Sequence, residues 1–135
     1  MPERVAAKRL IMKIFNDESP IYLQLRKHIE EKILEGALKE EDAIPSLRTM
    51  AKDYSLNPIT VANALSALVE EAILYKKRGL GIYVAPGARR KIIVSRRESF
   101  ETEILEPALQ KAKQLELTES ELNDKIKKIY GGPRD

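Results

Sequence analysis

Apolar residues recur with a helical period along the first half of the chain. One stripe begins after Ser19 and stops before Gly36, and its apolar positions are Ile21, Leu25, Ile29 and Ile33. This spacing predicts an amphipathic helix. We expect Ser19 to cap it and Pro20 to open it, because the first helical turn leaves its N–H groups unpaired and proline has none. His28 lies beside the stripe and is interpreted as an ordinary surface or boundary residue.

Two shorter helical patterns follow and are joined by a tight turn. Pro45 and Ser46 begin the first of them, and Ser46 could either cap the helix or bond a phosphate oxygen. Its inward positions are Leu47, Met50, Ala51 and Tyr54. Asn57 and Pro58 repeat the start signal for the next helix, whose buried positions are expected at Val61, Leu65, Leu68 and Val69. Together the two patterns predict a helix-turn-helix.

The opposite face of the later helix carries short or polar side chains near its N-terminus. These are Ile59, Thr60, Asn63 and Ser66. Small residues at Ala62, Ala64 and Ala67 are expected to keep this face low. Such a face is suited to close approach in the major groove of DNA.

A β-hairpin is predicted after this helix. Residues 73–75 and 82–84 are β-prone and flank a basic loop that contains Gly79 and Gly81. The loop is not a phosphate loop of an enzyme, because it does not connect a strand to a helix. At its tip, Lys76, Arg78 and Gly79 suit a phosphate or the minor groove. Ala43 and Ile44 could add a short third strand.

The remaining pattern divides the chain into segments. We predict an N-terminal extension without assigned chemistry (residues 1–18), a winged helix-turn-helix domain (19–87), a basic connector (88–97) and a helical segment (98–135). Helical character resumes at about Ile92, and Pro107 predicts a kink or break near Leu105 and Glu106. Thr118 and Glu121 form a capping box for a last helix. The predicted fold class is therefore mostly α with a small β-hairpin.

The helical segment has an apolar stripe without a partner. Its members are Phe100, Ile104, Leu105, Ala108, Leu109, Ala112 and Leu115. Some forty residues offer too little surface to bury such a stripe, so we predict a symmetric homodimer through these helices. The alternative is that the helices fold back onto the preceding domain.

Composition narrows the function by exclusion. The 135 residues include no cysteine and one histidine, which excludes disulfides, thiolate metal sites and most histidine metal sites. No cofactor and no metal are predicted. The apolar runs are too short to cross a membrane and no signal peptide is evident, so a cytoplasmic location is expected. No constellation of catalytic side chains is present, and Glu40 and Glu41 are interpreted as solvated carboxylates, so the chain is not predicted to be an enzyme.

Positive charge is concentrated in one segment. The chain has 24 basic and 21 acidic residues, but Lys76 to Arg97 contain eight basic residues and no acidic one. The rest of the chain therefore has 16 basic against 21 acidic residues. A solvated linker would explain such a run, but its position beside a helix-turn-helix favours contact with a polyanion.

The central motifs resemble those of the GntR family of bacterial transcription regulators. They are PIYLQL at 20–25, PS-x-R at 45–48, NP-x-TV at 57–61, AL at 64–65, LVE at 68–70, R-G-x-G at 78–81 and YV at 83–84. The short C-terminal part resembles the YtrA-like subfamily, which implies two dimerisation helices and a repressor, often of genes for membrane transporters. Two positions depart from the family pattern. Asn63 replaces a usual cation in the recognition helix, and Ala72 replaces a usual glycine after it.

The leading hypothesis is a homodimer that binds double-stranded DNA at a palindromic operator. Arg48, Thr60 and Asn63 would enter the major groove, Ser46 and Asn57 would contact phosphates, and Lys76, Arg78 and Gly79 would act from the wing. A winged-helix protein-interaction module without DNA binding is the alternative. A small-molecule effector could bind, but the sequence identifies none.

Overall fold

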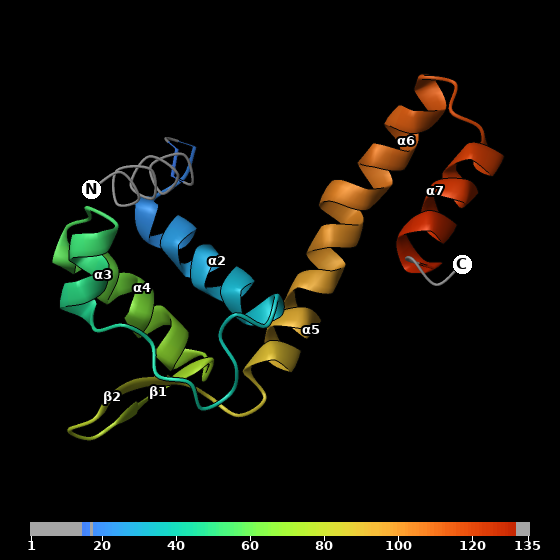
Figure 1. Cartoon of the computed structure of the whole chain (residues 1–135). Coiled ribbons are helices and arrows are strands. Elements are labelled where there is room, and N and C mark those ends of the chain that lie inside the picture. The colour runs from blue at the N-terminus through green and yellow to red at the C-terminus, as the bar shows by residue number, and fades with distance from the viewer. Residues whose placement is uncertain (1–14, 17, 132–135) are drawn as a thin grey trace, which may run out of the picture. The chain divides into compact units, whose positions relative to one another are not determined.

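The computed structural model describes residues 15, 16 and 18–131, and these fall into two compact units that divide between Val94 and Ser95 (Figure 1). The elements are α2 (Ile21–Leu34), α3 (Leu47–Asp53), α4 (Pro58–Glu70), β1 (Leu74–Lys77), β2 (Gly81–Val84), α5 (Ala88–Phe100), a π-helical turn (Glu101–Leu105), α6 (Glu106–Gln114) and α7 (Glu119–Gly131). The predicted fold class, mostly helical with one two-stranded hairpin, is confirmed. The N-terminal extension lies largely outside the described residues.

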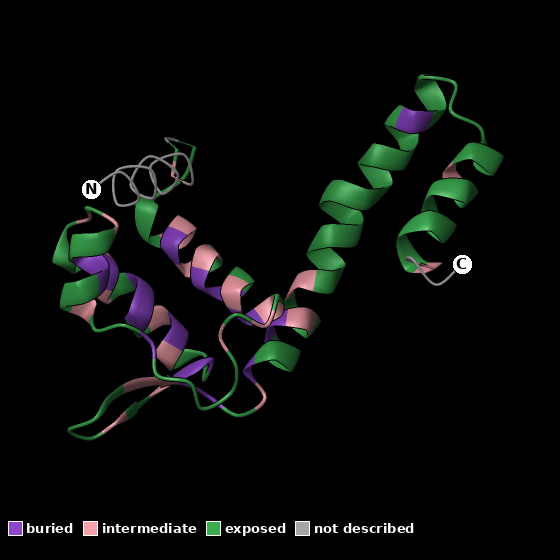
Figure 2. Cartoon of the chain, in the orientation of Figure 1, coloured by how far each residue is buried: buried purple, intermediate pink, exposed green. Residues whose placement is uncertain are grey.

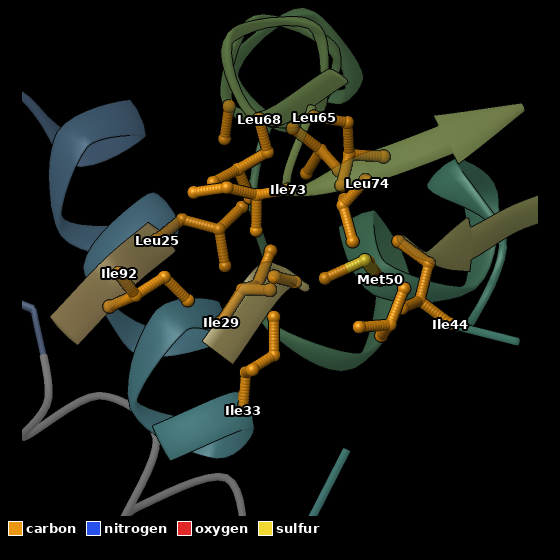
Figure 3. Packing of buried hydrophobic residues seen from close by; sticks show 14 of the residues in the cluster. Leu25, Ile29, Ile33, Ile44, Met50, Leu65, Leu68, Ile73, Leu74 and Ile92 are labelled. Carbon is orange, nitrogen blue, oxygen red and sulfur yellow. The ribbon is translucent and has the colours of Figure 1, made fainter. Parts of the chain in front are cut away.

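One aliphatic core holds the first unit together. Figure 3 shows side chains from α2, α3, α4, the hairpin and α5 meeting in it. Its fully buried large members are Leu25, Ile33, Val61, Leu68, Leu74, Val84 and Ile92. The predicted inward faces of the first three helices are confirmed with two corrections. Ile21, in the first turn of α2, is 41% exposed and does not join the buried stripe. Ala64 is fully buried, because it lies on the same face of α4 as Val61 and Leu68, and so it does not belong to the exposed face.

Helix α2 begins differently from the prediction. Pro20 itself is the N-cap residue, and no side-chain oxygen caps the helix, so Ser19 is not the cap. Instead, the side-chain amide of Gln24 donates to the backbone oxygens of Ser19 and Asn16, each at 2.7 Å. The Gln24 side chain, from within α2, thus fixes the segment that precedes the helix, and no capping hydroxyl does so. Gly36 follows the helix with φ of +86°, as a glycine at this position should.

The hairpin is longer than predicted and has a short third partner. Leu74 pairs with Val84 and Lys77 with Gly81, so the predicted loop residues 76 and 77 belong to β1. Ala43 forms an isolated bridge with Tyr83, and the N–H of Ile44 donates to the Ile82 oxygen at 2.9 Å. The third strand is therefore confirmed in its shortest form.

Of two predictions for the second half of the chain, one is corrected and one is confirmed. Helix α5 starts at Ala88 rather than near Ile92, directly after Gly87 at φ of +76°. The predicted interruption near Leu105 and Glu106 is present, because a π-helical turn ends at Leu105 and α6 begins at Glu106. The N–H of Glu106 donates to the Glu101 oxygen, so the missing N–H of Pro107 is accommodated by a change of hydrogen-bond pattern.

The capping box of α7 is confirmed in both directions. The N–H of Thr118 donates to Glu121 Oε2 at 2.8 Å, and the N–H of Glu121 donates to Thr118 Oγ1 at 3.1 Å. Most residues of α6 and α7 are exposed (Figure 2). In the described part of the chain, no helix is both long and apolar enough to cross a membrane.

Candidate nucleic-acid interface

Two side-chain caps hold α3 and α4 as a helix-turn-helix. The N–H of Thr49 donates to Ser46 Oγ at 3.1 Å, and the N–H of Ile59 donates to Asn57 Oδ1 at 2.9 Å. Both caps were predicted and both are confirmed. Between the helices, Ser55 adopts φ of +56° and the N–H of Leu56 donates to the Ala51 oxygen, which closes the turn.

The Ser46 hydroxyl has a second partner that the sequence did not reveal. It donates to Thr49 Oγ1 at 2.9 Å, so its hydrogen is used within the first turn of α3. The Thr49 hydroxyl accepts this bond and can direct its own hydrogen outward, and the Thr49 side chain is exposed. Thr49 is therefore a further donor at this helix end. A capping serine followed three residues later by a hydroxyl is the signal that could have found it.

The exposed face of α4 presents a polar stripe. Ile59, Asn63 and Ser66 are exposed, and their spacing of four and three residues places them on one side of the helix. Thr60, half-buried, flanks this stripe. Arg48 is exposed in the first turn of α3. The predicted site residues of the helix-turn-helix are therefore accessible to a ligand. They are Ser46, Arg48, Asn57, Thr60 and Asn63.

Two of the predicted wing residues, Arg78 and Gly79, are exposed in the hairpin turn, whereas Lys77 packs within the hairpin. Arg78 and Gly79 lie in the turn, which the N–H of Leu80 closes by donating to the Lys77 oxygen, and Gly79 has φ of +78°. Lys76 is exposed on β1. The Lys77 ammonium instead lies 4.1 Å from the centroid of the Tyr83 ring, a cation–π contact. Lys77 therefore stiffens the hairpin.

Two carboxylates hold the base of the hairpin. The Tyr75 hydroxyl donates to both carboxylate oxygens of Glu41, at 2.9 and 3.0 Å, and the N–H of Gly87 donates to Glu40 Oε1 at 2.7 Å. Partial burial, with the hydrogen bond to Glu41, raises the pKa of Tyr75 and keeps the phenol protonated. The interpretation of Glu40 and Glu41 as merely solvated was wrong, because both carboxylates accept hydrogen bonds within the fold. The donors lie more than thirty residues away in the sequence, so the sequence did not reveal them.

Part of the basic segment also has a structural role. Arg89 Nε donates to the Leu34 oxygen at 3.1 Å, and Lys91 Nζ donates to the Ala72 oxygen at 3.3 Å. Both acceptors lie at the C-terminal ends of helices, where cations complement the helix dipole. Arg90 and Arg97 are exposed. The charge run therefore includes cations that stabilise the fold as well as cations that face solvent.

Ala72 ends α4 in the conformation that glycine usually provides. Its φ is +60°, and the N–H of Ile73 donates to the Leu68 oxygen at 2.9 Å. The chain thus keeps the glycine-type helix ending in spite of the Cβ atom. The substitution leaves the hydrogen-bonded termination in place and puts a side chain in a strained region of φ.

Comparison with known proteins agrees with this geometry. Residues 21–84 match the family described as bacterial regulatory proteins, gntR family. The chain is 30% identical over 118 residues to the uncharacterized HTH-type transcriptional regulator YhcF of Bacillus subtilis. The matched region covers 87% of this chain and 96% of YhcF. The chain belongs to the GntR family. It is a DNA-binding transcriptional regulator, and the prediction that it is not an enzyme agrees with this family.

Further likenesses concern the subfamily and the fold of this GntR protein. It is 35% identical over 75 residues to the HTH-type transcriptional repressor YtrA of Bacillus subtilis, covering 56% of this chain and 58% of YtrA, in agreement with the predicted subfamily. A GntR family regulator from Listeria monocytogenes superposes with a TM-score of 0.63 at 26% identity, over 84% of this chain and 98% of that one. The AraR DNA-binding domain in complex with operator ORX1 has a TM-score of 0.50 at 25% identity, over 53% and 92%. The hairpin is thus the wing of a winged helix-turn-helix fold.

Proposed function

We propose that this GntR regulator is a cytoplasmic repressor that binds a palindromic operator as a homodimer. The observation that carries the proposal is the exposed polar stripe of α4. Side-chain caps at the starts of α3 and α4 precede this stripe, and an exposed basic turn follows it. The operator complex of the similar AraR domain supports the use of this fold on DNA. The repressor named YtrA supports the direction of regulation.

The proposed contacts follow from chemistry and exposure. Arg48 and Asn63 can each form a bidentate contact with a base, Arg with guanine and Asn with adenine, while Thr60 accepts or donates beside them. Ser46 and Asn57, with Thr49, lie at helix N-termini, which favour phosphate. Lys76, Arg78 and the backbone of Gly79 act from the wing on phosphate or the minor groove.

The dimer is proposed from the apolar surface of the second unit. Its exposed large apolar residues are Phe100, Ile104, Leu105, Leu109, Leu115, Leu117, Ile126, Ile129 and Tyr130. Of the described residues after Val94, Ala112 alone is buried. So many exposed apolar side chains in one small unit mark an interaction surface. A second copy would cover it and would supply the two readers that a palindrome requires.

The decisive experiment recovers the DNA that the purified protein retains from its own genome. We expect a palindrome whose half-sites are about one helical turn apart, ~34 Å. In gel-shift titrations the affinity for this site should fall steeply between ~50 and ~200 mM salt, because neutralised phosphates release counterions. No enriched site, or an affinity indifferent to salt, would refute the proposal and favour the protein-interaction module.

Repression is tested separately from binding. Deletion of the gene should raise transcripts whose promoters contain the recovered site, and genes for membrane transporters are the first candidates given the subfamily resemblance. A fall in those transcripts would make the protein an activator and leave the binding model intact.

A further inference from the structure

One large apolar side chain stands at the head of the recognition stripe. Ile59 is 68% exposed, one turn of α4 before Asn63 and two turns before Ser66. On the opposite side of the same helix, Val61 and Ala64 are fully buried. Ile59 is therefore the apolar member of an otherwise polar exposed stripe, on the helix that reads DNA.

The fold makes little use of the Ile59 side chain. It lies outside the core cluster, and the contribution of Ile59 to the helix start is its backbone N–H, which donates to Asn57 Oδ1 at 2.9 Å. A β-branched side chain also has a lower helix propensity than most unbranched ones. Local structure therefore gives no reason for isoleucine here. The same branching stiffens χ1, so the apolar group is held at one place on the helix surface.

The major groove offers one apolar feature to such a side chain, the 5-methyl group of thymine. Four residues of helix span about 6 Å, and base pairs are spaced by about 3.4 Å. We propose that Ile59 is a specificity-determining residue that packs on the 5-methyl group of a thymine within about two base pairs of the base read by Asn63. This inference rests on the proposed operator binding and names the base chemistry that the operator must contain.

The test uses the full chain and removes single methyl groups from its DNA. The probe is the palindromic duplex recovered in the genomic experiment, with each dT in turn replaced by dU, which lacks only the 5-methyl group. We expect about a fourfold loss of affinity at one thymine per half-site, which corresponds to the ~0.8 kcal/mol of one buried methyl-sized group. In Ile59→Ala this uracil penalty should shrink to less than twofold at the same position.

Leu80→Ala is the matched control. Leu80 is exposed to the same degree, 70%, but it lies in the wing turn. Whatever this variant does to overall affinity, it should keep the full uracil penalty. Because Ile59 is exposed and outside the core, Ile59→Ala should also keep the thermal stability of the original chain, which excludes misfolding as the cause of its altered response.

The outcomes separate this inference from the function on which it rests. Failure to recover any duplex would refute operator binding and the inference with it. Recovery of a duplex with no uracil penalty, or a penalty unchanged in Ile59→Ala, would refute the role of Ile59 alone. Replacing dC by 5-methyl-dC distinguishes the other source of this methyl group. Tighter binding there without a uracil penalty would assign the contact to methylated cytosine and overturn thymine reading.

Discussion

Ala72 carries backbone strain that glycine would relieve. A non-glycine residue at φ of +60° costs about 1–2 kcal/mol, and the greater freedom of glycine in the unfolded chain offsets part of the gain. Ala72→Gly should therefore raise the free energy of unfolding by about 0.5–1 kcal/mol. Urea unfolding monitored by circular dichroism measures this change.

The same alanine-to-glycine substitution inside α4 provides the control, because it should have the opposite effect on stability. Ala62 lies in the interior of α4, so Ala62→Gly should lower the free energy of unfolding by about 0.5–1 kcal/mol. If both variants lose stability, the helix ending is unstrained and this account of Ala72 is wrong.

Arg48 is the strongest candidate for a base contact because it combines a bidentate donor with an exposed position at the start of α3. Arg48→Ala should weaken specific operator binding by about 1–3 kcal/mol if the side chain bonds a guanine. Gel-shift titration against the recovered operator measures this loss. Lys39→Ala removes one exposed cation that has no proposed DNA contact, so it should change affinity little. Equal effects of the two variants would reduce Arg48 to a general charge.

His28 should make stability depend on pH near neutrality. Burial first, and the Lys32 charge second, lower the pKa of His28, whose ring packs edge-on against Tyr54 at 5.6 Å. The folded protein therefore favours the neutral imidazole. Stability should be fully present above the unfolded pKa of about 6.5 and should be lost as the pH falls toward the lower folded pKa.

Unfolding free energies measured at intervals from pH 7.5 to 5.5 test this expectation, using His28→Gln as the comparison. The variant cannot titrate at this position, so its stability should fall less over that interval. Identical pH profiles for the two proteins would show that the imidazole is not the group responsible.

At the scale of elements, the wing depends on contacts with the loop between α2 and α3. The Tyr75 hydroxyl donates to the Glu41 carboxylate, while the Tyr83 hydroxyl has only a 3.5 Å contact with the Leu80 oxygen. Tyr75→Phe should therefore lower the urea concentration at the midpoint of unfolding, and Tyr83→Phe should lower it by much less. Chemical denaturation of the two variants gives both values. A larger loss for Tyr83→Phe would contradict this view of the wing base.

The elements also show which structural information is local in the sequence. The caps at Ser46, Asn57 and Thr118 were predictable because donor and acceptor lie within three residues of each other. The partners of Glu40 and Glu41 were not predictable, because folding brings them from distant positions. Pro107 indicated an interrupted helix, but a π-helical turn and a break remove the same hydrogen bond, so the sequence could not distinguish them.

The candidate site divides in the same way. The polar stripe of α4 follows from helical spacing and could be derived before the structure. The sequence could not show which cations of the basic segment contact other parts of the fold, because charge alone does not reveal a side chain's partners. The structure shows that Arg89 bonds the last carbonyl of α2 and Lys91 bonds a carbonyl just after α4, whereas Lys77 packs on an aromatic ring.

For the whole molecule, the proposed dimer has a consequence for both assembly and DNA binding. Leu109 is 44% exposed on α6, and a lysine there would place charge in the apolar surface that is proposed to pair. Leu109→Lys should convert the dimer to a monomer in sedimentation equilibrium. Ile21→Lys is the matched control, because Ile21 is 41% exposed but lies in the first unit, and this variant should remain a dimer.

The salt dependence of binding then reports how many readers engage the operator. The slope of log K against log salt is about −0.9 for each neutralised phosphate, and a dimer on two half-sites neutralises twice as many phosphates as a monomer on one. Leu109→Lys should therefore bind the palindrome with about half the slope of the original chain, and should bind a single half-site as tightly as the original chain does at concentrations below its dimerisation constant. If Leu109→Lys keeps the full slope and still sediments as a dimer, the pairing surface lies elsewhere in the chain. A monomeric variant that keeps the full slope would instead mean that DNA itself brings two copies together.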